Sequence, residues 1–400
     1  MMCKEKRRVP KLRFPGFTED WEQYRFNNLL KKNLEKNDGK FNSNKTISIA
    51  RMKYNKLGNG ASNESLNNYK VLRFGDIAFE GHENKDFKFG RFVMNDIGDG
   101  IMSPRFTALR PIKVLNVEFW KEYINYEPIM QKKLVNSTKK GTMMHELVVD
   151  EFLKQDILLP SKKEQQKIGR LLKLQSNIIN LYQRKVEHLI LKKKALLQKL
   201  FPRNGNRYPD FRFPGFTAPW EQRKLGDYLS IPEKEILEVA SSDDLITVKL
   251  NLGGVELGAS RDTLSLGSTV YYKRYAGQFI YGKQNFFNGS MGLIPTNLDG
   301  KGSSGDVPSF NVSNIEENYL YIYVSRESYW RSKEAAASGT GSKRIHEKTF
   351  LDFNIDVPSM DEQKLISNTF DLIDRFITLH QRKLEHLQIQ KKSLLQKLFV

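Results

Sequence analysis

The sequence predicts an α+β fold in which two similar mixed α/β domains are separated by two long helices that form an antiparallel coiled coil with pseudo-two-fold symmetry. The first observation is a repeat, because residues 13–18 (RFPGFT) return 199 positions later as residues 212–217. The second is that residues 181–201 match residues 379–399 at 15 of 21 positions without a gap. The stretches between these repeats hardly resemble each other. We therefore expect two constant frames that hold two variable domains.

Both repeated C-terminal frames place apolar residues at alternating steps of four and three, which is typical of a coiled-coil seam. Eight of ten seam positions are apolar in each frame. Lys193 and Lys391 interrupt the seam at the same register. Either their stems extend to solvent near a helix end, or they fix the alignment as polar seam residues. The predicted seam is Ile168, Leu172, Gln175, Ile179, Tyr182, Val186, Leu189, Lys193, Leu196 and Leu200 with Ile366, Phe370, Ile373, Ile377, His380, Leu384, Leu387, Lys391, Leu394 and Leu398.

The helix starts carry clear signals. Ser161 and Ser359 each precede a glutamate, Glu164 or Glu362, by three residues, which predicts an N-cap serine with a capping-box glutamate. A helix over residues 162–200 is roughly 55 Å long at 1.5 Å per residue. Parallel pairing would force the following connection to return along most of that length, so we prefer the antiparallel arrangement.

The order along the chain is domain, helix, domain, helix. Short runs of β-branched and aromatic residues predict strands inside both domains, at 46–50, 70–74, 76–79 and 91–94 in the first and at 245–250, 269–272, 278–281 and 319–324 in the second. The boundaries are an N-terminal segment (1–20), a first variable domain (21–160), a central helix (161–201), a linker (202–219), a second variable domain (220–358) and a C-terminal helix (359–400).

The formal net charge of +19 suggests a polyanionic partner such as nucleic acid. The charge is unevenly distributed: +4 over 1–19, +5 over 20–160, +9 over 161–201, −1 over 202–358 and +2 over 359–400. More than half of the excess therefore lies on the helices, where solvated lysines also account for it. A single cysteine, Cys3, fits a reducing cytosol, and no apolar run approaches the ~18 residues of a membrane span. We expect a cytoplasmic protein.

Taken together, these residues resemble the DNA-specificity subunit of type I restriction-modification systems. The resemblance covers essentially the whole chain. It rests on the paired RFPGF-x-x-x-W-E-Q openings, on a Gly-Thr pair (Gly141-Thr142 and Gly339-Thr340) that stands 19 residues before a Pro-Ser, and on the two helices ending in L-L-Q-K-L-F.

The resemblance implies two target-recognition domains, each reading one half of a bipartite sequence in double-stranded DNA. It also implies two modification subunits that methylate adenine and two restriction/translocase subunits. S-adenosylmethionine, ATP and Mg are then cofactors of those partner subunits, and this chain holds none. The base to be methylated is expected to be flipped into the partner's pocket.

The residues themselves give no sign of catalysis. The Asn/Asp-Pro-Pro-aromatic element of adenine methyltransferases does not occur, and six histidines show no metal-ligand spacing. Gly282-Lys283 ends a phosphate-loop-like run, but Gln284 follows where a hydroxyl is needed. We therefore expect a non-enzymatic subunit with no catalytic residue and no metal site. The alternatives are an orphan DNA-binding protein without a restriction partner and a coiled-coil adaptor or scaffold protein.

Candidate DNA contacts are polar side chains that can reach base edges or phosphates from loops of the variable domains. In the first domain they are Arg51, Lys53, Tyr54, Asn55, Lys56, Lys85, Lys88, Arg91 and Arg105. In the second they are Lys249, Asn251, Tyr272, Lys273, Arg274, Lys283, Gln284, Asn285, Lys343 and Arg344.

Overall fold

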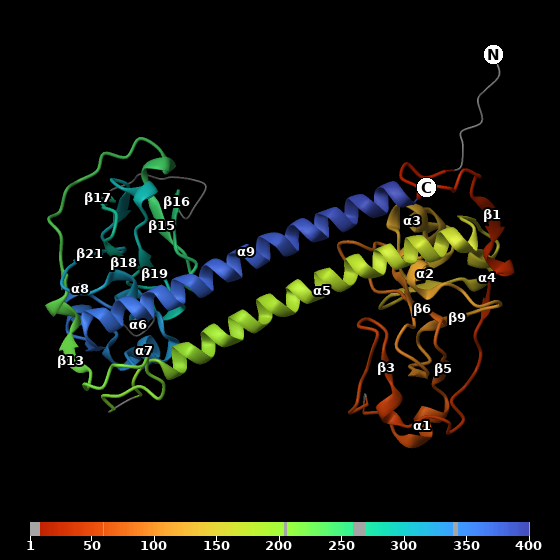
Figure 1. The fold of residues 1–400 in the computed structure, drawn as a ribbon, viewed down its shortest axis with the longest axis horizontal. Helices are drawn as coiled ribbons and strands as arrows, with labels where there is room; N and C mark the ends of the chain where they lie inside the picture. The colour runs from red at the N-terminus through yellow and green to blue at the C-terminus, as the bar shows by residue number, and fades with distance from the viewer. Residues whose placement is uncertain (1–8, 59, 204–205, 259–268, 339–342, 400) are drawn as a thin grey trace, which may run out of the picture. The chain divides into compact units, whose positions relative to one another are not determined.

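The computed structural model describes residues 9–58, 60–203, 206–258, 269–338 and 343–399, so Cys3 and Gly339-Thr340 lie outside the described residues. The chain forms two compact units. The first unit contains Met1–Arg184 and Gln381–Val400, and the second contains Lys185–His380. Each unit therefore holds one sheet-rich domain together with a section of both long helices (Figure 1).

An antiparallel sheet of order β2-β9-β6-β7 is the centre of the first domain. β6 (Ile77–Glu80) is buried along its whole length between β7 (Arg91–Met94) and β9 (Thr107–Pro111). The other strands are β1 (Glu22–Arg25), β2 (Leu30–Lys32), β3 (Ile47–Ser48), β4 (Lys53–Tyr54), β5 (Lys70–Leu72), β8 (Gly100–Met102), β10 (Thr138–Lys140), β11 (His145–Leu147) and β12 (Asp156–Leu159). The short helices are α1 (Asn63–Asn67), α2 (Val117–Tyr123), α3 (Glu127–Val135) and α4 (Val149–Leu153).

The long helices complete the core of the first domain. Ile168 and Leu172 of α5 (Lys162–Lys199) lie in the same buried cluster as Trp120 of α2 and as Leu398 of α9 (Met360–Leu398). Phe399 sets its ring edge-on to Tyr123 at a centroid distance of 4.8 Å. A smaller buried cluster, which includes Ile47, Ile49 and Met52, underlies the loops that carry the predicted DNA contacts.

The second domain is built around an equivalent sheet of order β14-β21-β18-β19. Its core is aromatic, with Phe279 stacked on Phe350 at a centroid distance of 5.5 Å. The strands are β13 (Glu221–Lys224), β14 (Leu229–Ser230), β15 (Ile246–Val248), β16 (Val255–Leu257), β17 (Tyr271–Lys273), β18 (Phe279–Tyr281), β19 (Met291–Leu293), β20 (Gly302–Ser304), β21 (Ser309–Val312) and β22 (Asn354–Val357), and the short helices are α6 (Glu317–Ser325), α7 (Glu327–Arg331) and α8 (Glu347–Leu351).

One predicted strand was wrong, because residues 319–324 lie in helix α6. The Glu316 side chain caps this helix by accepting a hydrogen bond from the Tyr319 backbone. The helical period then buries Tyr319 and Tyr323 one turn apart on the core side. The run is rich in aromatic residues, which favour strands in isolation, but the cap and the core contacts decide for a helix.

The predicted coiled-coil pairing is confirmed. All twenty seam positions are buried or half-buried, whereas the helix positions between them are mostly exposed. In the first unit the Gln175 side chain donates to the Leu387 carbonyl at 3.2 Å, while Leu172 joins the cluster that contains Leu398. In the second unit Lys193 meets Asp374. Within each unit the two helix sections therefore run antiparallel, in agreement with the expected α+β fold.

Both seam lysines are paired with a carboxylate. Lys193 Nζ lies 2.6 Å from Asp374 Oδ1 on the facing helix. Lys391 Nζ lies 2.7 Å from Glu122 Oε1 on α2, and both of these side chains are about four-fifths buried. Lys193 therefore links the two long helices, which agrees with the second interpretation, whereas Lys391 links α9 to α2 of the first domain.

The serine N-caps are also confirmed, since Ser161 Oγ accepts from the Glu164 backbone at 3.3 Å and Ser359 Oγ accepts from the Glu362 backbone at 3.4 Å. The capping-box role of the glutamates was wrong. The carboxylate of Glu164 instead accepts two hydrogen bonds from Arg13 of the repeated opening, and Glu362 is held in the same way. A charged guanidinium is a stronger donor than the backbone N–H that a capping box offers.

Candidate nucleic-acid interface

Three loops of the first domain bring predicted DNA contacts together: β3–β4, β6–β7 and β8–β9. Arg91 Nη2 donates to the Ala50 carbonyl at 2.8 Å, and this bond joins the first two loops. Phe106 of the third loop packs on the cluster that contains Ile47 and Ile49. The sequence could not show that these three loops contact one another, because they are far apart along the chain.

Among the described residues, the predicted contacts on these loops and on the adjoining ends of β4 and β7 divide into two groups. Tyr54, Asn55 and Arg91 are bonded within the domain, to the Asp99 carbonyl, the Gly58 carbonyl and the Glu80 carboxylate respectively. They hold the loops in place. The others are exposed cations with no side-chain partner in the described part of the chain, and so can meet phosphates or base edges: Arg51, Lys53, Lys56, Lys85, Lys88 and Arg105.

These loops surround a cavity of about 270 Å³ whose lining includes Glu80, His82 and Ser103. The Glu80 carboxylate is almost fully buried and lies 2.7 Å from Arg91 Nε and 3.2 Å from His82 Nδ1. A carboxylate is a hydrogen-bond acceptor suited to the amino group of a cytosine. Glu80 therefore gives this cavity a carboxylate acceptor close to the exposed cations.

Our sequence reasoning missed Glu80 and His82, since an acidic residue does not by itself signal a DNA contact. A usable signal was present in the glycine between them. A Cβ at Gly81 would lie 1.8 Å from the His145 carbonyl oxygen, so β11 approaches the backbone too closely for any other residue. Such a glycine directly after a buried strand marks a constrained loop.

The second domain brings together another set of predicted contacts. The backbone N–H groups of Asn251 and Leu252 donate to the carbonyls of Asn288 and Gly289 at 2.7 and 2.9 Å. Those bonds hold the β15–β16 turn against the loop that follows β18, which carries Gln284. Asn251 and Leu252 have φ values of 56° and 57°, a conformation that is strained for residues other than glycine and is enriched at functional sites.

The cations of the second domain differ from those of the first in being neutralised. Gln284 and Asn251 are exposed, and Asn285 accepts a bond from Asn288. Exposed ion pairs are weak, so DNA phosphates can compete for the lysines and the arginine of the exposed pairs, whereas the Lys283–Glu347 pair is largely buried. All the predicted cations except Arg274 pair with an acid: Lys249 with Glu256, Lys273 with Glu235, Lys283 with Glu347, Lys343 with Glu334 and Arg344 with Asp306.

Arg274 does not occupy the exposed position that we expected. It is 6 % exposed, and its guanidinium donates to Ser303 Oγ at 2.7 Å and to the carbonyls of Ser304 and Val307. Burial lowers its pKa to about 10. The ring of Tyr272, on β17, lies 5.6 Å from the guanidinium of Arg274, which directly follows this strand. Arg274 therefore ties the end of β17 to β20 and to the segment that follows it, and its donors are used inside the domain.

Both long helices also carry exposed apolar residues outside the seam. They recur at steps of four and three, which places them on one helix face. Exposed apolar patches of this kind mark interaction surfaces. The same positions recur in both helices at an offset of 198. We call them the apolar stripes: Leu174, Ile178 and Leu181 on α5, and Leu372, Phe376 and Leu379 on α9.

Two further findings concern metal binding and membrane spans among the described residues. Within ranges 9–58, 60–203, 206–258, 269–338 and 343–399, no cluster of three or more His, Cys, Asp or Glu side chains is placed to bind a metal ion. In the same part of the chain, no helix has the length and apolar character of a membrane span.

Comparison with known proteins gives consistent results. The profile of a family described as "Type I restriction modification DNA specificity domain" matches residues 219–388. Over 406 residues the chain is 22 % identical to a protein described as the MjaX specificity subunit of a type I restriction enzyme from Methanocaldococcus jannaschii, covering 94 % of this chain and 92 % of that protein. It is 21 % identical to the MjaVIII specificity subunit of the same organism, covering 68 % of each chain.

Among solved structures, the fold is similar to the S subunit of a type I restriction-modification system from M. genitalium. The TM-score is 0.59 at 12 % sequence identity, and the match covers 98 % of this chain and 99 % of that one. At such low identity the likeness concerns the fold, which is therefore shared over nearly the whole length.

Proposed function

Because this chain belongs to the family of DNA-specificity subunits of type I restriction-modification systems, we propose that its two domains each read one half of a bipartite sequence in duplex DNA. The long helices then set the distance between the half-sites, as dimer geometry does in other DNA-binding proteins. Membership of this family does not favour the two alternative functions, a coiled-coil adaptor or scaffold protein and an orphan DNA-binding protein without a restriction partner.

The observation that carries this proposal is the contrast between constant contacts and variable loops. The pairs Arg13–Glu164 and Arg212–Glu362 are the same contact in two places. The loops with the predicted DNA contacts differ in sequence and charge between the domains, with unpaired cations in the first and ion-paired cations in the second. Two different surfaces on one repeated frame are what reading two different half-sequences requires.

We further infer that the apolar stripes bind the partner subunits. Leu174 and Leu181 on α5 have their counterparts Leu372 and Leu379 on α9. Two equivalent stripes suit two copies of a modification subunit that methylates adenine, with two restriction/translocase subunits joining the complex. In this proposal the chain is non-catalytic and cytoplasmic. The partner subunits hold S-adenosylmethionine, ATP and Mg.

The decisive experiment is to co-express the chain with a cognate modification subunit in an unmethylated host and to map modified adenines by long-read sequencing. We expect one split motif with a modified adenine on each strand. Exchanging residues 221–357 for those of a relative should alter only one half of the motif. Methylation at unrelated sites, or none, would refute the proposal.

A further inference from the structure

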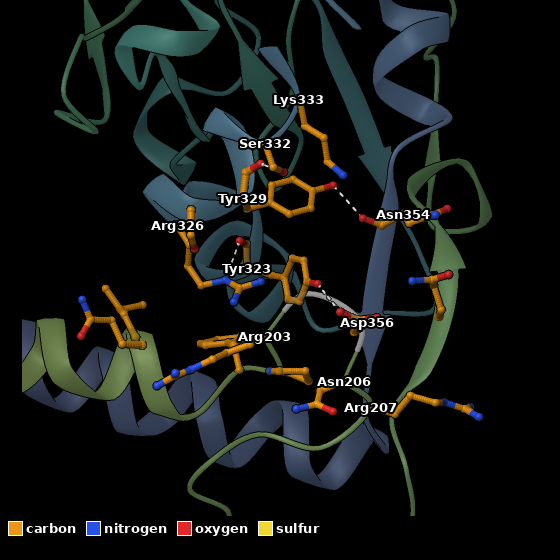
Figure 2. A pocket seen from close by; sticks show the side chains of 16 residues that line it. Arg203, Asn206, Arg207, Tyr323, Arg326, Tyr329, Ser332, Lys333, Asn354 and Asp356 are labelled. Atoms are coloured by element: carbon orange, nitrogen blue, oxygen red, sulfur yellow. Dashed lines mark hydrogen bonds between the residues drawn. The ribbon is translucent and has the colours of Figure 1, made fainter. Parts of the chain in front are cut away.

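A polar pocket of about 900 Å³ lies within the second unit, between the end of α5, the linker and helices α6 and α7 (Figure 2). None of the predicted DNA contacts lines it. Its charged residues come from separate elements. Arg203 and Arg207 belong to the linker, Arg326 stands between α6 and α7, Lys333 follows α7, and Asp356 lies on β22.

Arg326 is held in one orientation. Its Nε donates to the Tyr323 carbonyl at 3.1 Å. Its guanidinium carbon lies 4.0 Å from the centroid of the Tyr323 ring and 4.3 Å from that of Phe201, which is itself 1 % exposed. A guanidinium fixed on two aromatic faces loses little freedom when it binds an anion. Figure 2 shows the Arg326 side chain beside Tyr323, with Arg203 below them in this view.

The pocket has an excess of positive charge that its own residues do not neutralise. Of its four cations, Arg203 pairs with Asp210 at 2.7 Å. Within the described ranges, no carboxylate lies within ion-pair distance of Arg207, Arg326 or Lys333. The one lining carboxylate, Asp356, accepts a hydrogen bond from the Tyr323 hydroxyl at 2.7 Å. Burial lowers the pKa of Lys333, and the charge of Asp356 only partly offsets this.

The first domain has a smaller pocket at the equivalent place, of about 430 Å³. There Tyr126 replaces Arg326: each residue is the N-cap of its helix, and each contacts the aromatic residue that ends a long helix. Leu158 replaces Asp356 in the paired strand. The cavity is thus a feature of the fold, whereas its arginine-rich wall belongs to the second domain.

From this geometry we propose that the pocket binds an acidic peptide segment of a protein partner. Arginine forks bind carboxylates through paired hydrogen bonds, and the volume lies in the range of ligand sites, roughly 300–1,000 Å³. A flexible segment can insert Asp and Glu side chains into a concave wall, whereas the convex backbone of a duplex cannot enter it. This inference adds a docking site to the proposed function and does not depend on it.

The test is binding of a fluorescein-labelled hexaglutamate peptide to the full-length chain, followed by fluorescence anisotropy at low ionic strength. Arg326→Met with Lys333→Met should weaken binding by about tenfold or more, corresponding to about 1.4 kcal/mol. The matched control is Lys192→Met with Lys194→Met on exposed positions of α5, which removes the same charge. The control should change the affinity by less than about twofold, since a local site loses no contact.

A second variant guards against misfolding of the first. Arg203→Gln with Arg207→Gln alters exposed linker side chains and should weaken the peptide by a similar factor. Equal losses in the pocket variants and the α5 control would overturn the proposal, because binding would then follow net charge alone. Displacement of the peptide by equimolar inorganic phosphate or by a short DNA duplex would overturn it as well, since the site would then recognise phosphate.

Discussion

Arg13 and Glu164 form an ion pair with two hydrogen bonds, at 2.7 and 2.9 Å, although they stand 151 residues apart in the chain. Only 1 % of the Glu164 side chain is exposed. Next to it, the Leu12 N–H donates to the Lys397 carbonyl. Each RFPGF segment thus joins the start of one long helix to the end of the other. The same two contacts recur in the second unit at Arg212–Glu362 and Phe211–Lys199.

The first prediction concerns this ion pair. Glu164→Gln keeps the shape of the side chain but leaves the Arg13 charge without its partner. Breaking one side of a buried pair costs about 3–5 kcal/mol. We expect a loss near the lower end, because Arg13 keeps some contact with solvent, and urea unfolding should report it. Glu362→Gln should act alike in the second unit. Glu221→Gln, which breaks an exposed pair, should cost less than about 1 kcal/mol; equal effects of Glu164→Gln and Glu221→Gln would contradict this account.

The second prediction concerns acid stability of the first domain. Hydrogen bonds from Arg73 and from Arg110 hold the pKa of Glu35 at about 2, below its ordinary value of 4.5. A depressed pKa means that the stabilisation is complete above pH 4.5 and is lost as the pH falls towards 2. The buried Asp76 in this network has its pKa raised by burial, so its contribution has the opposite sign. The wild type must therefore be compared with Glu35→Gln.

The stability difference between wild type and Glu35→Gln is expected to shrink as the pH is lowered from about 5 towards 2.5, across the range set by these pKa values. Chemical unfolding at each pH measures it. Glu64→Gln, on an exposed position of α1, serves as the control and should show no such trend. A difference that stays constant over this range would show that Glu35 is not the group that titrates. In the second domain, the place in the sheet that corresponds to this charged network holds an uncharged, hydrogen-bonded pair, Gln278 and Asn311.

The repeated frame could be predicted from the sequence because periodicity records burial directly. Every seam position, from Ile168 to Leu398, is at least half-buried, since steps of four and three admit only one buried face. The serine N-caps were equally local signals. Helix α6 was missed because its aromatic residues suit a strand locally, and only the Glu316 cap and the surrounding core decide otherwise.

The candidate interface could be predicted only in part, and for a different reason. Residue type indicates which side chains can meet DNA, but their ion pairs depend on residues that are distant in sequence. Lys283 pairs with Glu347, and Arg274 is buried against residues 303–307. Glu80 enters the site only because β6 ends beside the β3–β4 turn. No periodic pattern in the sequence predicts these contacts between distant residues.

The third prediction follows from the unequal pairing of cations. In the assembled complex, Lys53→Gln with Lys56→Gln should reduce the slope of log K against log salt by about 2, because each lost phosphate contact removes about 0.9. Lys249→Gln with Lys343→Gln should change the slope less, since each lysine is already paired with a glutamate. Equal changes for the two variants would show that the ion pairs of the second domain open on DNA.

The fourth prediction tests the apolar stripes. Leu174→Ser with Leu181→Ser removes apolar area from α5 without touching the seam, so the fold should be retained. Native mass spectrometry of the co-purified complex should then show one bound modification subunit in place of two. The equivalent change at Leu372 and Leu379 should have the same effect. Asn180→Ser, on the exposed side of α5, is the control, and retention of two subunits by both stripe variants would exclude these surfaces as docking sites.

The fifth prediction is that the length of the long helices sets the distance between the two half-sites. Deleting residues 182–188 from α5 together with residues 380–386 from α9 removes one heptad from each and keeps the seam in phase. Seven residues shorten a helix by about 10 Å, the length of about three base pairs at 3.4 Å each. Methylation mapping should then find both half-sequences unchanged with a spacer about three base pairs shorter. An unchanged spacer would separate half-site distance from helix length. Deleting the heptad from one helix alone is the matched control, and should abolish specific methylation because the seam partners no longer face each other.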